Sequence, residues 1–106
     1  MSDSIGALRA RVMLQCPTRV ADEIGGAAIA WIDQGEAWAE IEATGASEIG
    51  AFDAAGSLTS FRVTINHRAD VRTGWRLAWG ERVLRIAGVR DGGAPRIELN
   101  CEEETP

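Results

Sequence analysis

The chain contains no lysine and no tyrosine, and His67 is the single histidine among its 106 residues. All 11 basic residues are arginines, and the acidic residues outnumber them, which gives a formal net charge of −5. A protein that captures DNA regardless of sequence needs a cationic surface that releases counterions, so this charge balance argues against that class. It is compatible with a wall past which DNA moves without sticking, because like charges repel.

Cysteine is also scarce. Cys16 and Cys101 lie far apart, and neither belongs to a C-x-x-C pair. Zinc sites use closely spaced cysteines and histidines, so no metal site is predicted from these cysteines and His67. We expect both thiols to be free in a reducing cytoplasm. No stretch approaches the roughly 20 apolar residues of a membrane span, and the N-terminal segment shows no signal-peptide core.

The usual arrangements of catalytic residues are missing as well. His67 follows the apolar face of a predicted strand, which is typical of a partly buried strand histidine. No serine has a G-x-S-x-G setting, and no phosphate-binding glycine loop follows a strand. Glu40 and Glu42 share one strand face, whereas glycosidase carboxylates oppose each other across a cleft. The sequence therefore predicts no enzyme, no catalytic residue and no cofactor.

What the sequence does contain is strand-like alternation, together with 12 glycines that fit short strands and tight turns. Apolar residues alternate from Leu8 to Cys16, and Pro17 is expected to end that strand because proline cannot donate to a ladder. Thr18 to Gly26 is expected to be a polar loop. A second strand, Thr59 to Arg68, alternates most clearly of all.

The C-terminal part, Gly74 to Cys101, has the pattern of three strands joined by two turns. The first turn is placed at Gly80-Glu81, where glycine supplies the positive φ that two-residue hairpin turns require. The second is placed at Asp91 to Pro95. The acidic tail that follows, residues 102–106, is expected to fray.

Two segments are ambiguous. Ala27 to Ala43 is too long for one straight strand, so its interruption at Asp33-Gln34-Gly35 marks either a hairpin or a long strand bent by a bulge. Thr44 to Leu58 is either a surface loop or a protruding arm, with Ser47 as a possible cap of a short helix. The patterns together predict an all-β fold. It is a small antiparallel β-barrel of about six strands with one short helix or long loop insertion, in a single domain over residues 1–106.

Several outward side chains are candidates for contacts between subunits. An exposed Trp38 beside Glu40 either packs under the following loop or contacts another subunit. Arginines suit ion pairs with carboxylates across an interface, although outward arginines also serve solubility. The candidate subunit interface comprises Arg9, Arg11, Trp38, Glu40, Glu42, Arg62 and Arg68.

Three elements occur in order along the chain. They are L-R-A-R-V-M-L-Q at Leu8 to Gln15, W-A-E-I-E at Trp38 to Glu42, and arginine-bearing strand patterns from Arg62 to Asp91. Each element alone is a generic strand pattern. The ordered set, which spans nearly the whole chain, resembles the bacteriophage head–tail joining family. This family comprises the head-completion, adaptor and stopper proteins of tailed phages and gene transfer agents.

The resemblance implies a β-barrel that assembles as a homo-oligomeric ring at the neck of a virion or phage-like particle, made in the bacterial cytoplasm. Such a ring would join head to tail and help retain packaged DNA. Its partners would be a portal or adaptor ring, tail terminator proteins, and double-stranded DNA that passes without sequence-specific binding. No cofactor and no membrane are implied.

In stopper-type members of that family, a loop between early strands projects into the channel. By position this loop corresponds to Thr44 to Leu58, and the first loop, Arg19 to Gly26, is the other candidate for contact with neighbouring rings. The candidate residues of the projecting arm are Ser47, Glu48, Ile49, Phe52 and Asp53.

A binding module is the alternative from another functional class. A small barrel of SH3 or OB type that recognises a peptide or single-stranded nucleic acid needs an exposed aromatic platform flanked by cationic residues. Trp75 and Trp79 are instead expected on the core face of their strand, and the net charge has the wrong sign for nucleic acid.

Overall fold

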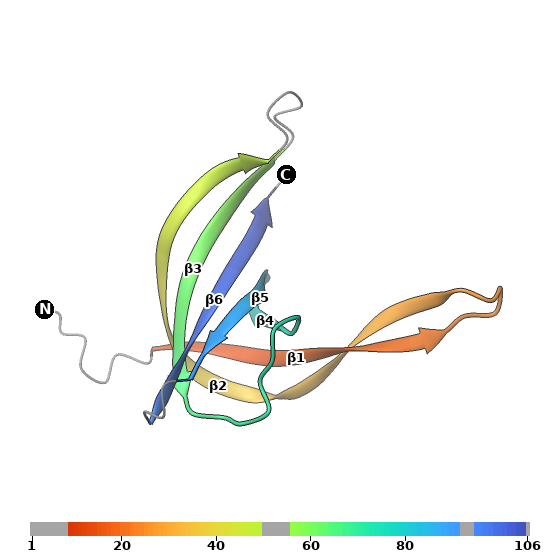
Figure 1. The fold of residues 1–106 in the computed structure, drawn as a ribbon, viewed down its shortest axis with the longest axis horizontal. Coiled ribbons are helices and arrows are strands. Elements are labelled where there is room, and N and C mark those ends of the chain that lie inside the picture. Colours follow the sequence, from red (N-terminus) through yellow and green to blue (C-terminus); the bar gives the residue numbers. More distant parts are fainter. Residues whose placement is uncertain (1–8, 50–55, 92–94, 106) are drawn as a thin grey trace, which may run out of the picture.

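The computed structural model describes residues 9–49, 56–91 and 95–105. Within these ranges the chain forms strands only, and they close into a barrel in the order β1-β2-β3-β6-β5-β4 (Figure 1). The strands are β1 (Ala10–Ala21), β2 (Ala27–Ile49), β3 (Gly56–Asn66), β4 (Arg76–Trp79), β5 (Arg82–Arg90) and β6 (Arg96–Thr105). All neighbouring strands pair antiparallel. The predicted all-β antiparallel barrel is confirmed.

The barrel interior is filled by the apolar residues that alternate along each strand. Burying one such side chain stabilises the fold by about 1.5–3 kcal/mol relative to leaving it exposed. Among the described residues no polar or charged residue is buried with them. Trp75 and Trp79 pack partly buried against this core, as their strand pattern predicts. The core consists of Val12, Leu14, Ala39, Phe61, Val63, Ile65, Val71, Leu77, Leu84, Ile86, Ile97, Leu99 and Cys101.

The long β2 strand is bent by a bulge and is not a hairpin. Leu14 pairs with Gly35 and Gln15 pairs with Asp33, so Gln34 is the extra residue that faces no partner in β1. Gly35 has a φ of 114°, which side chains rarely adopt, so a glycine suits this position. Of the two interpretations that the sequence leaves open for Ala27 to Ala43, the bent strand is the one that the structure shows.

The prediction that Pro17 ends the first strand is wrong. β1 continues to Ala21, and Pro17 pairs with Trp31 of β2. On its other side β1 pairs with β4 only from Met13 to Gln15, so Pro17 lies at a free edge where its missing N–H removes no ladder bond. The expected loop Thr18 to Gly26 is therefore half strand. The β1–β2 hairpin projects well beyond the barrel (Figure 1).

The short helix predicted near Ser47 is not formed in the part of that segment that the structure describes. Ser47, Glu48 and Ile49 continue β2 and pair with the start of β3. Residues 50–55, where the rest of that helix was expected, lie outside the described residues. The strand wins over the helix because each of these residues has a paired neighbour across the ladder, which a capped helix of one or two turns does not offer.

The expected fraying of the acidic tail is also wrong for the tail residues that the structure describes. β6 runs to Thr105, and Glu102 and Glu103 pair with Ser60 and Thr59 of β3. Arg82 reaches the Glu103 carboxylate with its Nε at 2.9 Å and its Nη2 at 2.6 Å. The turn at Gly80-Glu81 is confirmed, because Trp79 pairs directly with Arg82 and Gly80 has a φ of 62°.

This ion pair makes stability depend on pH. The hydrogen bond from Arg82 holds the pKa of the Glu103 carboxyl below its usual value. A carboxyl whose pKa is lower in the folded state stabilises the fold above its unfolded pKa, and that contribution is lost as the pH falls through the folded pKa. Glu103→Gln should therefore lower the urea midpoint near neutral pH, and the gap from wild type should close in acid. Glu81→Gln, in the exposed β4–β5 turn, is the matched control. A difference in urea midpoint between Glu103→Gln and wild type that stays the same at all pH values would contradict the prediction.

Candidate assembly surfaces

The proposed interface residues on β1 and β2 form a patch around Trp38. The ring of Trp38 is half exposed on the outer face of β2, and the Arg11 guanidinium lies 5.1 Å from the ring centroid. Arg11 also forms an ion pair with Glu36 at 3.3 Å. Neighbouring Arg9 ties the start of the chain to β2 through its backbone N–H, which donates to the Ala39 carbonyl at 3.0 Å. The Trp38 patch thus presents an aromatic surface with a cation stacked on it.

The other proposed interface residues on β2 and β3 contact residues of the neighbouring strand in the same barrel. Arg62 of β3 donates to Glu42 of β2 at 3.2 Å, and both side chains are largely exposed. Such an exposed pair contributes little to stability, typically under about 1 kcal/mol, so both charges can rearrange toward a partner. Glu40 lies half-buried on the same strand and pairs with Thr64 in the ladder.

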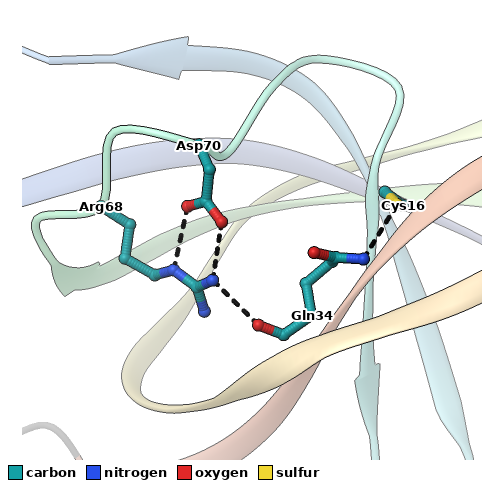
Figure 2. A network of polar contacts seen from close by, with 4 residues as sticks. All are labelled: Cys16, Gln34, Arg68 and Asp70. Carbon is teal, nitrogen blue, oxygen red and sulfur yellow. Dashed lines mark hydrogen bonds and ion pairs between the residues drawn. The ribbon is translucent and has the colours of Figure 1, made fainter.

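Arg68 occupies a different position from the rest of the proposed interface, because it clamps the root of the β1–β2 hairpin (Figure 2). Its guanidinium donates to Asp70 at 3.1 and 2.8 Å and to the Gln34 carbonyl at 2.9 Å. The Gln34 side-chain amide in turn donates to the Cys16 sulfur at 3.2 Å. The hydrogen bonds from Arg68 lower the pKa of Asp70. The bulged residue Gln34 is thereby held from both sides.

Replacing Arg68 with alanine should loosen the hairpin root. The Gln34 carbonyl and Asp70 lose their charged donor, which costs about 1–3 kcal/mol for hydrogen bonds of this kind. We expect a lower urea midpoint and faster amide exchange at residues 33–36. Arg90→Ala is the control, because Arg90 and Glu98 form a loose surface pair at 3.9 Å. Unchanged exchange at the bulge in the Arg68 variant would contradict the clamp.

A second cluster holds the opposite side of the hairpin root. Arg76 of β4 lies 4.2 Å from the centroid of the Trp31 ring and donates to the Gln15 side chain at 2.7 Å. The Gln15 amide then donates to Asp33 at 2.8 Å. Strand alternation alone does not connect Arg76 to Trp31. That contact depends on β1 continuing past Pro17, which brings Trp31 beside β4.

The proposed arm begins as paired β-strand, with β6 on the other side of β3. Ser47, Glu48 and Ile49 lie in β2, opposite Leu58, Ser57 and Gly56 of β3. Phe52 and Asp53, the other candidate arm residues, lie outside the described residues. Figure 1 shows that this end of β2 and β3 and the β1–β2 hairpin extend in different directions from the barrel. The molecule therefore carries two separate projections.

The candidate catalytic and metal-binding groups do not come together. His67 was expected on the apolar face of its strand, but β3 ends at Asn66 and His67 is exposed, with its Nε2 at 2.8 Å from Asp91. Burial raises the pKa of the Cys101 thiol to about 12, which keeps that sulfur protonated and unreactive at neutral pH. The described part of the chain contains no group of three or more potential metal ligands. It also contains no helix of the length and apolarity that a membrane crossing requires.

The extended β1–β2 hairpin, which includes the first loop proposed from the sequence to contact neighbouring rings, carries a concentration of exposed apolar side chains. Its exposed large apolar residues outnumber those on the rest of the described chain, where only Trp38 and Val83 are comparable. The signal was present in the sequence, since the alternation of Leu14 and Cys16 continues through Thr18 to Val20. The exposed large apolar residues on the hairpin are Val20, Ile24, Ile29 and Ile32.

Comparison with known proteins supplies a family and a structural likeness. A family model described as phage head completion protein matches residues 3–104. A chain from the virion of a native gene transfer agent particle is 27% identical and has a TM-score of 0.75, with 90% of this chain and 93% of that chain covered.

A second solved structure adds a likeness of fold alone. It is the solution structure of protein SF1141 from Shigella flexneri 2a, which is 24% identical with a TM-score of 0.63. The alignment covers 90% of this chain and 91% of that chain. No curated protein matches the chain.

Proposed function

Because this chain belongs to the phage head completion protein family, we propose that it is a connector subunit that assembles as a ring between the portal and the tail. In this role it joins head to tail and helps to retain packaged DNA. The work is structural and not enzymatic. The observation that carries the proposal is the likeness to a chain of a gene transfer agent virion over nine-tenths of both chains.

The architecture supports a role in assembly. A closed barrel leaves few free strand edges, so the body of the subunit is a rigid block suited to repetition around an axis. The two projections extend beyond that block and are free to reach neighbours. Trp38, with Arg11 stacked on it, supplies an aromatic and cationic anchor of the kind that is enriched in interfaces.

The channel role is assigned to the β2–β3 projection. This assignment follows from the position of the segment between early strands. Its proposed contact residues are Ser47, Glu48, Ile49, Phe52 and Asp53. A net charge of −5 suits a conduit for DNA, because an acidic wall repels phosphates and lets the duplex pass without binding. The proposed partners are a portal or adaptor ring on one side and tail terminator proteins on the other, in the neck of a particle assembled in the bacterial cytoplasm.

The alternative binding-module function has less support. Trp75 and Trp79 are partly buried against the core and do not form an exposed stacking platform. Arg82 lies 4.6 Å from the centroid of the Trp79 ring and is itself bound by Glu103, so its charge is compensated.

Gene deletion tests the proposed function. Without this protein, capsids should fill with DNA but fail to acquire tails, and the DNA should leak on purification. The measurement is electron microscopy of particles together with nuclease-resistant DNA per capsid, with the gene supplied in trans as the control. Tailed, DNA-filled particles in the deletion strain would contradict the proposal.

A further inference from the structure

The distal part of the β1–β2 hairpin has no third strand beside it in the described structure. β1 and β2 pair from Cys16–Ile32 to Ala21–Ala27, while β4 ends its pairing at Gln15 and β3 begins its pairing at Ala39. A two-stranded ribbon is only marginally stable in water by itself. The clamps at Arg68 and Arg76 hold its root, but they do not cover its length. Any partner that covers the length of the ribbon therefore has to come from outside its own barrel.

The tip of this ribbon presents one large apolar side chain. Ile24 is 92% exposed, the highest value among the large hydrophobic residues whose exposure the structure describes. The turn that carries it is ordered by Asp22, whose Oδ1 accepts the backbone N–H groups of Ile24 at 3.1 Å and Gly26 at 2.8 Å. The Asp22 N–H donates to the Gly26 carbonyl at 3.1 Å. A side chain held out in a fixed geometry loses little entropy on docking, which is the property of an interface anchor.

The barrel carries a hollow that matches such an anchor. It has a volume of about 220 Å³ and lies over β3, β5 and β6. Its apolar floor includes Leu58 and Val83, and Val83 is 43% exposed. Its other lining residues are Arg85 and Glu102. The strands that line the hollow are not those of the ribbon. The Ile24 tip and the hollow are therefore two distinct surfaces of one molecule.

The charges around the two surfaces are complementary. Beside the hollow, Arg85 pairs with Glu102 and Arg82 pairs with Glu103. In each pair the guanidinium is the more exposed partner, at 65% against 30% and at 45% against 16%. The guanidinium groups of these pairs are therefore more accessible to a partner than the carboxylates. Next to Ile24 at the ribbon tip lies the exposed carboxylate of Glu23.

We propose that the occupant of the hollow is the β1–β2 tip of a second copy of this chain. Ile24 of one subunit inserts between Leu58 and Val83 of the next, and Glu23 meets Arg85. Because the Ile24 tip of one subunit meets a different surface of the next, the contact is head-to-tail. Repetition of this contact through a suitable rotation closes a ring. This inference rests on the proposed ring assembly and names the contact that builds it.

Cysteine cross-linking in purified particles tests the contact. A chain that carries Ile24→Cys and Val83→Cys in a Cys16→Ser background should give, on mild oxidation, a series of covalent multimers longer than dimers. A variant with only one of the two introduced cysteines should give no such series, because the remaining native Cys101 is buried. Ile29→Cys with Val83→Cys is the matched control, because Ile29 is exposed on the same ribbon but away from the tip.

The outcomes separate this inference from the proposed function. If the wild-type chain is in the particles and the double variant gives only monomers, or a product with a different particle protein, the second-copy contact is wrong and the connector role stands. If the wild-type chain is absent from particles, the connector role falls, and the contact falls with it.

A charge exchange provides a second test that does not depend on disulfide geometry. Glu23→Arg or Arg85→Glu alone should reduce the number of copies incorporated per particle by about tenfold, because each change sets two like charges against each other in the contact. The two changes together should restore incorporation, because the pair is rebuilt with its signs reversed. Failure of the double variant to recover, with the purified chain still folded by circular dichroism, would overturn the contact.

Discussion

Replacing residues 48–57 of the connector with an Asn-Gly dipeptide is expected to make particles lose packaged DNA or fail to join tails. The defect should be as large as that of particles that lack the protein. Ser47 pairs with Leu58, so the dipeptide closes the ladder there with a favoured two-residue hairpin turn. The change removes Glu48, Ile49 and the segment that carries Phe52, but it leaves in place every core residue that the structure describes. The readouts are nuclease-resistant DNA per capsid and the fraction of tailed particles.

The same dipeptide in another hairpin is the control for this prediction. Gly80→Asn with Glu81→Gly rebuilds the β4–β5 turn and does not touch the β2–β3 projection. Particles with this control should be full and tailed. If particles with the shortened projection are also full, tailed and active, the projection has no role in retention or joining.

The second large effect concerns the barrel itself. Leu99→Ala removes a fully buried side chain from β6, which pairs with both β3 and β5. The lost burial and the remaining cavity should cost about 2–5 kcal/mol, a large fraction of the roughly 5–15 kcal/mol that stabilises a small domain. Urea unfolding followed by tryptophan fluorescence measures the loss.

Val20→Ala provides the comparison for the core variant, because Val20 is about half exposed on the ribbon. Its effect should stay within about 0.5 kcal/mol. An equally small effect of Leu99→Ala would show that the closed core does not determine stability.

The sequence was a reliable guide where one face of a strand is buried. Val63, Ile65 and Leu99 alternate with polar residues, and all three are in the core. Val12 and Leu14, which flank Met13, are in the core as well. Alternation has this power because a strand places successive side chains on opposite faces, so one dry face fixes the pattern. The fold class followed from this alternation, and the ordered set of motifs carried the resemblance to the family.

The sequence was a poor guide where neighbours from distant parts of the chain decide the outcome. Pro17 is tolerated in β1 because no strand pairs with its outer edge, and the acidic tail is ordered because Arg82 binds Glu103. The roles of Arg68 and Arg76 as clamps depend on where the bulge at Gln34 falls. None of these contacts can be found by local periodicity, since each joins residues whose distance is set by the closed sheet.

A density map of the particle neck should show several copies of this barrel around the channel axis, between the portal and the tail. Each β1–β2 tip should lie against the neighbouring barrel. Density for the chain on the capsid shell or at the tail tip, or a single copy off the axis, would contradict this arrangement.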